Sequence, residues 1–288
     1  MLPEGPRCRS VYGRYTCIVR VEPLRAKLHR CRPHPRQSAR ARGSNRRFPL
    51  PIRSLIAWLD ADAPFPPIHT ALDEPNGLLA AGGDLSPVRL IDAYRRGIYP
   101  WYSAGQPLLW WSPDPRMVLY VDDFRLSRSL AKRMRRREFD VRIDTAFGDV
   151  IEACAEARRN GQQGTWITRD MIGAYRQLHE RGYAHSVEAW RDNEMVGGLY
   201  GLALGRAFFG ESMFARASDA SKVCLASLVG LLQRRNVVMI DCQQETAHLA
   251  SMGARPISRR EFARKLGELI NSNAAPPGWR SGRLLECG

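Results

Sequence analysis

Several features are missing from this 288-residue sequence, and each absence excludes a class of protein. No stretch approaches about 18 uninterrupted apolar residues, which excludes a membrane-spanning helix. The basic N-terminus lacks an apolar segment ending in a small-residue cleavage site, so we expect no secretory signal. The seven cysteines are an odd number and form no C-x-x-C pair, which favours free thiols in a reducing compartment. We therefore expect a cytoplasmic protein with a hydrophobic core.

Two common kinds of catalytic site are also missing. Ser212 lies in the run GESMF, which lacks the G-x-S-x-G spacing of a hydrolase nucleophile. The six histidines are scattered, and none is paired with an acid in the manner of a metal-binding helix. The sequence therefore predicts neither a serine hydrolase nor a metal centre.

The net charge of +15 is concentrated near the N-terminus. Residues 1–53 hold thirteen Arg and one Lys against two Glu, a net of +12, so the remaining 235 residues carry only +3. We expect the first 53 residues to be a disordered tail, because they show no helical or strand period. The tail is interpreted foremost as sequence that is not part of the native protein, and otherwise as a phosphate-gripping arm or a transit peptide.

The rest of the chain predicts a mixed α and β protein without internal repeats. We expect helices at 87–97, 127–137, 146–159, 170–181, 218–235 and 261–270, and strands at 117–121, 139–144, 185–190, 195–203, 207–214 and 237–243. Antiparallel strands followed by a helix, a strand and a helix are typical of an α+β fold. We divide the chain into the tail (1–53), a small N-terminal domain (54–121), a larger domain (122–271) and a C-terminal tail (272–288).

Polar side chains at strand ends are the first candidate site. Asp241 and Gln243 follow the buried run VVMI, and the strand period of two places them on one face and Cys242 on the other. This pattern is equally typical of a strand that simply leaves the core. Glu211 lies in an otherwise apolar strand and needs a partner or a function. Cys242 is a poor nucleophile, because the neighbouring acid raises a thiol pKa.

A basic helix is the second candidate site. Helical spacing aligns Arg128, Lys132 and Arg135 or Arg136, and the first acidic residue after them is Glu138. An uncompensated row of cations favours a polyanion partner over a simple solvated face. Aromatic residues between 94 and 111 could stack unpaired bases, although most aromatics are core residues.

Six blocks in order resemble the leucyl/phenylalanyl-tRNA–protein transferase family, over about residues 56–270. They are EPNGLLAAGGDLSP from residue 74, YRRGIYPW from 94, WWSPDPR from 110, GTWITR from 164, GESMF from 210 and DCQ from 241. The resemblance implies a small N-terminal α+β domain and a C-terminal domain like that of the GCN5-related N-acetyltransferases. Such folds usually bind acetyl-CoA through a glycine-rich loop, but Asp219 stands where a glycine would approach the pyrophosphate. We therefore expect no cofactor.

The reaction implied by the resemblance is aminolysis. Leu or Phe, with Met as a further donor, passes from aminoacyl-tRNA to the N-terminal amine of proteins beginning with Arg or Lys, which marks them for degradation. The resemblance places Gln243 at the amine, with Asp241 and Glu211 in support. It places Trp101, Tyr94, Trp166 and Tyr175 at the tRNA 3′-adenosine. It suggests an apolar aminoacyl pocket that includes Leu199, Phe208, Met213 and Ile240.

The basic helix would then hold tRNA phosphates through Arg128, Lys132, Arg133, Arg135 and Arg136 without reading sequence. The partners expected are Leu-tRNA, Phe-tRNA and the acceptor proteins, with no membrane and no metal. Two other functions stay open at this stage: a CoA-dependent N-acetyltransferase and a noncatalytic RNA-binding module.

Overall fold

The structure is a computed structural model that describes residues 56–157, 165–270 and 279–284. The predicted tail at 1–53 lies outside the described residues, as does most of the stretch predicted to follow residue 271. Within the described residues, no helix has both the length and the apolar composition needed to cross a membrane.

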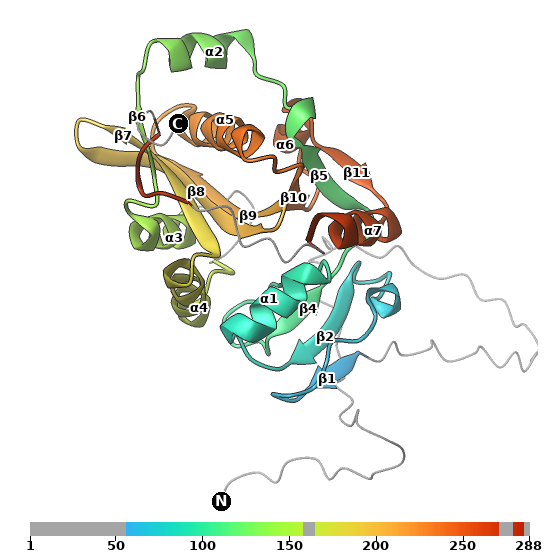
Figure 1. The fold of residues 1–288 in the computed structure, drawn as a ribbon. Coiled ribbons are helices and arrows are strands. Elements are labelled where there is room, and N and C mark those ends of the chain that lie inside the picture. The colour runs from blue at the N-terminus through green and yellow to red at the C-terminus, as the bar shows by residue number, and fades with distance from the viewer. Residues whose placement is uncertain (1–55, 158–164, 271–278, 285–288) are drawn as a thin grey trace, which may run out of the picture.

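A small four-stranded sheet forms the first part of the fold (Figure 1). Its strands lie in the order β1-β2-β4-β3, with β1 and β2 parallel and the other two pairings antiparallel. The helix α1 follows β2 in the chain and packs on this part of the molecule (Figure 1). The bounds are β1 (Ala57–Leu59), β2 (Leu78–Gly82), α1 (Pro87–Arg95), β3 (Tyr99–Pro100) and β4 (Leu109–Trp111).

An eight-stranded sheet forms the second part, in the order β11-β5-β10-β9-β8-β7-β6-β12. The pair β9–β10 is parallel, and the other pairings described in this sheet are antiparallel. The strand bounds are β5 (Arg116–Tyr120), β6 (Asp140–Ile143), β7 (Ala184–Arg191), β8 (Glu194–Leu204), β9 (Ala207–Ala215), β10 (Met239–Gln243), β11 (Arg255–Ile257) and β12 (Gly282–Arg283).

Helices cover both faces of the larger sheet, which buries a core on each side (Figure 1). The helix α5 covers one face, with α2 outside it, whereas α3 and α4 cover the other face. The helix bounds are α2 (Arg128–Arg135), α3 (Phe147–Glu156), α4 (Arg169–Glu180), α5 (Ala220–Arg234), α6 (Ala247–Ser251) and α7 (Arg259–Ile270). The expected mixed α and β fold is therefore confirmed.

Local capping explains why the helices begin where the sequence predicted. The hydroxyl of Ser86 accepts a hydrogen bond from the third residue of α1, and Pro87 occupies its first position. Ser127 caps α2 and Thr168 caps α4 in the same way. These caps place the observed helix starts within two residues of the expected ones.

The four strands of the small sheet, β1 to β4, were not expected, and neither were the short elements α6, β11 and β12. The strand β12 lies within the stretch predicted as a C-terminal tail and pairs with β6. The strand β5 joins the larger sheet, although the predicted boundary at residue 121 assigned it to the small domain. The sheets therefore divide between Trp111 and Arg116, and the division into domains stays a prediction.

Candidate functional site

The candidate site lies where the parallel strands β9 and β10 separate. Their register runs from Met239 opposite Ala207 to Asp241 opposite Phe209 and then ends, although β9 continues to Ala215. The chain turns sharply at this point, because Gln243 has a φ of 60°, in the left-handed region. A cavity of about 270 Å³ lies beside the opening, and residues from β9, β10, α5 and β3 line it.

One end of the cavity is apolar. The four residues that the resemblance assigned to an aminoacyl pocket all line it: Leu199, Phe208, Met213 and Ile240. Leu225 and Leu228 of α5 and Leu249 of α6 complete this lining, and sequence reasoning missed them. The structure thus brings the four expected residues together, and their binding of a Leu or Phe side chain stays a prediction.

Two indole rings lie at the same cavity. Trp101 and Trp166 both line it and both are partly exposed. Trp101 is held by Trp111, whose ring packs edge-on at 5.4 Å and whose indole nitrogen donates a 2.6 Å hydrogen bond to the Trp101 carbonyl oxygen. Both rings are therefore accessible to a base that stacks against them.

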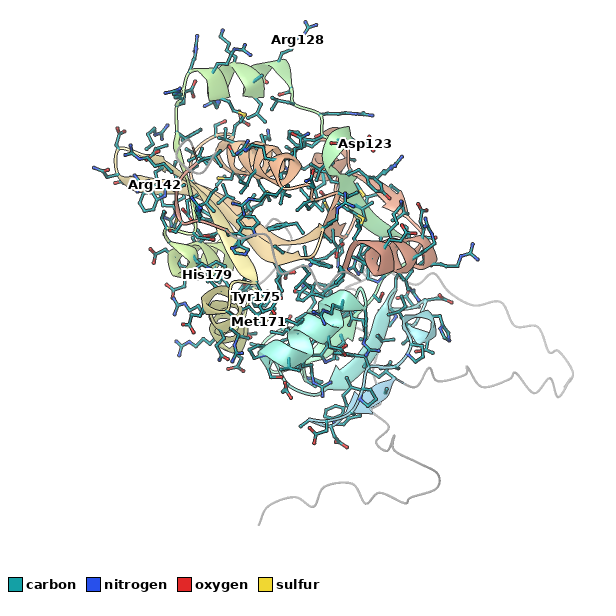
Figure 2. The ribbon with its side chains drawn as sticks, in the orientation of Figure 1. Asp123, Arg128, Arg142, Met171, Tyr175 and His179 are labelled. Carbon is teal, nitrogen blue, oxygen red and sulfur yellow. The ribbon has the colours of Figure 1, made fainter. Side chains whose placement is uncertain are left out.

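Tyr94 and Tyr175 are placed differently from the expectation. Both side chains are fully buried, and neither lines the cavity. Each hydroxyl lies within hydrogen-bonding distance of the Glu211 carboxylate, at 2.7 Å from Tyr94 and 3.0 Å from Tyr175, and the two hydroxyls also lie within hydrogen-bonding distance of each other. Tyr175, labelled on α4 in Figure 2, therefore holds Glu211 rather than offering a ring to a nucleotide.

The carboxylate of Glu211 is the main ionisable group of the cavity. It is only 8% exposed and accepts a third hydrogen bond, 2.9 Å long, from the amide nitrogen of Gln243. Burial raises the pKa of Glu211 to about 7, and the hydrogen bonds from the two tyrosines oppose this rise. A carboxyl with this pKa can gain or lose a proton near neutral pH.

Asp241 does not face the cavity. Its carboxylate is fully buried and forms a two-point pair with the Arg116 guanidinium, with N–O distances of 2.8 and 2.6 Å. It also accepts a 2.9 Å hydrogen bond from the backbone nitrogen of Gln243. The structure thus differs from the expectation that Asp241 and Gln243 would point into one site. Asp241 instead shapes the turn that carries Gln243 into the cavity.

Sequence reasoning missed Arg116, which is fully buried between aromatic rings. Its guanidinium carbon lies 4.7 Å from the ring centroids of both Tyr99 and Phe262, and a nitrogen donates to the Gly97 carbonyl at 3.3 Å. The available signal was the positive charge of Arg116 at the end of the WWSPDPR block. If such a residue is buried, it requires an anionic partner.

Cys242 lines the cavity, but its chemistry is unfavourable for attack. Burial and the nearby Asp241 carboxylate both raise the pKa of the Cys242 thiol well above its ordinary value. At neutral pH the side chain is therefore a thiol rather than a reactive thiolate.

The basic helix α2 carries four exposed cations, Arg128, Lys132, Arg135 and Arg136, here called the exposed α2 cations. Figure 2 shows Arg128 pointing away from the molecule. The fifth expected cation, Arg133, is half-buried and lies 2.8 Å from Glu138 and 3.5 Å from Asp219. The exposed α2 cations are thus available to phosphates, whereas Arg133 is already paired.

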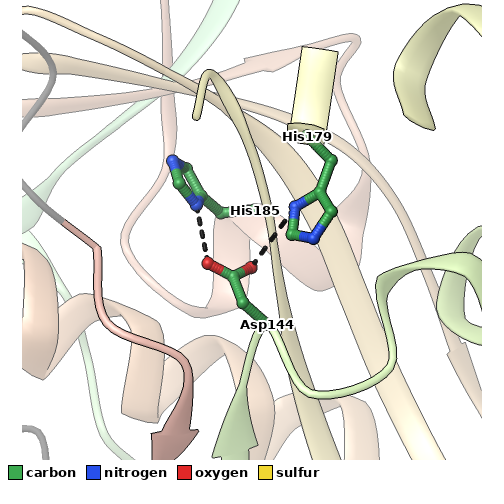
Figure 3. A group of neighbouring side chains, drawn as sticks. All are labelled: Asp144, His179 and His185. Carbon is green, nitrogen blue, oxygen red and sulfur yellow. Dashed lines mark hydrogen bonds and ion pairs between the residues drawn. The ribbon is translucent and has the colours of Figure 1, made fainter. Parts of the chain in front are cut away.

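A separate group of Asp144, His179 and His185 has the residue types of a metal site (Figure 3). Within the described part of the chain, however, hydrogen bonds already occupy it. His185 bonds Asp144 at 2.8 Å and the Gly182 carbonyl at 3.1 Å, and His179 bonds the Ala184 carbonyl at 2.8 Å. Trp279 stacks on His185 at 4.0 Å. The group therefore fits a structural clamp that anchors residue 279 to the sheet.

Comparison with known proteins identifies the family. A model described as "Leucyl/phenylalanyl-tRNA protein transferase" matches residues 118–267, and one described as the N-terminal domain of that transferase matches 83–114. The chain is 59% identical to the leucyl/phenylalanyl-tRNA–protein transferase of Nitrosospira multiformis over 75% of this chain and 93% of that protein. It is 56% identical to that of Bordetella avium, over 81% and 96%.

Two of the solved structures that match the chain, both at low similarity, are acetyltransferases. A ribosomal-protein-alanine N-acetyltransferase from Brucella melitensis biovar Abortus is 20% identical, with a TM-score of 0.28 over 50% of this chain and 96% of that one. A GCN5-related N-acetyltransferase from Kribbella flavida is 10% identical, with a TM-score of 0.31 over 62% and 64%. The sequence matches, which extend over most of the chain, show that it belongs to the leucyl/phenylalanyl-tRNA–protein transferase family of enzymes.

Proposed function

We propose that this protein transfers Leu or Phe from aminoacyl-tRNA to the free N-terminal amine of proteins beginning with Arg or Lys. This transfer would take place in the cytoplasm and mark the acceptor proteins for degradation. The observation that carries the proposal is the cavity itself, which has an apolar end, two indole rings and the Glu211–Gln243 pair together. An aminoacyl ester and an amine need these three features in one place.

The chemistry required is modest. The amine nitrogen attacks the ester carbonyl carbon, a C–N bond forms, and the bond to the ribose 3′ oxygen breaks. One proton leaves the amine and one is taken up by the departing ribose oxygen. Since the ester is already activated, most of the acceleration can come from alignment, which reaches effective concentrations of about 10⁵–10⁸ M.

Glu211 and Gln243 are placed to handle the amine. The amide nitrogen of Gln243 donates to Glu211, which leaves its carbonyl oxygen free to accept a hydrogen bond from the attacking amine. A carboxyl with a pKa of about 7 can then receive the proton released during attack. Tyr94, Tyr175 and Asp241 act as positioning residues, because they touch these two groups and not the cavity.

The remaining contacts follow from shape and charge. We assign the tRNA 3′-adenosine to Trp101 and Trp166, and the Leu or Phe side chain to the apolar end of the cavity. The exposed α2 cations would hold tRNA phosphates. The basic side chain of the acceptor would be attracted by Glu211, because Arg116 neutralises Asp241.

A CoA-dependent N-acetyltransferase is the alternative, and the entrance to α5 disfavours it. Asp219 precedes this helix with a φ of 64°, and its carboxylate pairs with Lys222 at 2.8 Å and Arg133 at 3.5 Å. Asp219 therefore places a side chain, held by two ion pairs, where a glycine would let backbone amides approach a pyrophosphate. This side chain is the observation that favours aminoacyl-tRNA over acetyl-CoA as the donor.

The transfer assay uses Leu-tRNA carrying radiolabelled Leu and a peptide beginning with Arg. The expected result is label on the free peptide and none on the same peptide with an acetylated N-terminus. Acetyl-CoA serves as the competing donor, and acetylation of the peptide would favour the alternative. Binding of tRNA without any transfer would contradict the proposal and indicate an RNA-binding module.

Gln243→Ala should reduce turnover while leaving tRNA affinity nearly unchanged.

A further inference from the structure

Tyr99 lines the cavity together with residues of β9 and β10. It belongs to β3, and its ring is fixed by β4 pairing and by the Arg116 guanidinium 4.7 Å from its centroid. The side chain is only 4% exposed. The ring is therefore held rigidly at the boundary between the small sheet and the cavity.

The hydroxyl of Tyr99 differs from those of Tyr94 and Tyr175. Among the described residues it makes no hydrogen bond of ordinary geometry, whereas the other two bond Glu211. The exposed side chain of Gln244, which also lines the cavity, makes only a weak hydrogen-bonding contact with this hydroxyl. A buried hydroxyl held only by a weak contact is costly, and because Tyr99 lines the cavity, a bound ligand can supply a stronger hydrogen bond.

The surroundings of this hydroxyl favour a ligand that carries N–H groups. Glu211 and Asp241 are close enough to affect its ionisation, and burial raises the pKa of Tyr99, so the group is a neutral phenol at neutral pH. Its oxygen can accept a hydrogen bond, as can the Gln243 carbonyl oxygen and the Glu211 carboxylate. Three oxygen acceptors around one cavity match an amino group.

We propose that the Tyr99 hydroxyl accepts a hydrogen bond from a substrate amino group and so helps to fix the substrate for transfer. The inference rests on the proposed function, in which two amino groups enter this cavity. One is the α-amine of the aminoacyl ester, and the other is the N-terminal amine of the acceptor protein. The chemistry recognised is the same in both cases, and kinetics can separate them.

Tyr99→Phe is the matched substitution, because it removes only the oxygen and keeps the ring on Arg116. Tyr120→Phe is the control: its hydroxyl is also buried without a hydrogen bond among the described residues, but it does not line the cavity. Both variants are tested in the full chain by steady-state transfer, with separate kcat/KM values for Leu-tRNA and for the peptide. Thermal melting of each variant reports its folding.

We expect Tyr99→Phe to reduce kcat/KM by about tenfold, as for a lost hydrogen bond to a charged or polar group, with Tyr120→Phe unchanged. A tRNA that carries 4-methylpentanoate, the analogue of Leu without its α-amine, distinguishes the two amines because it has no donor at that position. If Tyr99 contacts the donor amine, the variant and the wild type should use this analogue equally well. If it contacts the acceptor amine, the tenfold loss should persist with the analogue.

Unchanged kinetics of Tyr99→Phe in an active wild-type background would overturn the inference. A loss matched by Tyr120→Phe and by lower melting temperatures would overturn it as well. Failure of the wild type to transfer Leu at all would instead refute the proposed function, so the two failures are distinguishable.

Discussion

Replacing Glu211 by Gln is expected to remove part of the pH dependence of stability. The folded protein raises the pKa of this carboxyl from 4.5 to about 7, so the folded state binds the proton more tightly than the unfolded chain. The associated stability is fully present below pH 4.5 and is lost as the pH rises to about 7. At about 1.4 kcal/mol per tenfold change in proton affinity, the loss amounts to about 3 kcal/mol.

The assay is urea denaturation of wild type and Glu211→Gln between pH 4 and 8. Gln cannot ionise, so the free energy of unfolding of the variant should gain on that of the wild type by about 3 kcal/mol across this range. Glu180→Gln, on the exposed face of α4, is the control and should keep a constant difference. A constant difference for Glu211→Gln would refute the reasoning.

Turnover should depend on pH in the opposite sense to stability. Wild-type kcat/KM should rise as the pH passes about 7, because only ionised Glu211 can accept the proton from the amine. The acceptor amine, with an ordinary pKa of about 7.7–8.0, adds a second rise. Glu211→Gln should lose most activity and keep only the second rise. The carboxylate thus destabilises the folded protein at the pH where it is most useful.

Three further predictions concern other parts of the molecule. Asp241→Leu should lower the free energy of unfolding by about 3–5 kcal/mol because it leaves Arg116 buried and unpaired, and adding Arg116→Met should recover much of the loss in urea denaturation. No recovery would contradict the pairing argument. Alanine at the exposed α2 cations should reduce the slope of log tRNA affinity against log salt by up to about 3, whereas Arg133→Ala should change it less. Cys242→Ala should retain turnover, and a complete loss would show that the thiol takes part.

Local signals in the sequence were sufficient to predict most of the fold. Helix starts follow from local capping, in which a side-chain oxygen accepts a hydrogen bond from the backbone nitrogen three positions later. The capping residues are Ser86, Ser127 and Thr168. The strands β7 and β8 were both predicted, and they pair as a hairpin whose turn residues, Asp192 and Asn193, both adopt positive φ. The strands β1 to β4 of the small sheet and the short elements α6, β11 and β12 were not predicted, because they are two to five residues long and depend on packing rather than on periodicity.

Only part of the set of residues expected at the candidate site lines the cavity, and their arrangement was not predicted. Gln243 and Glu211 were named together, and they do form a hydrogen bond across the opening between β9 and β10. The orientation of Asp241 could not be predicted, because it is set by Arg116, 125 positions earlier in the chain. The strand period of two does not predict the bulge and the left-handed turn that separate Asp241 from Gln243.

The position of Arg116 has a consequence for how this enzyme can be divided. Its guanidinium joins the Asp241 carboxylate of β10, the Gly97 carbonyl after α1, and the rings of Tyr99 and Phe262. Neither sheet would therefore keep all the contacts of Arg116 if it were transplanted alone into another scaffold. A graft of the larger sheet alone would keep the ion pair but strip away half of the cage around it.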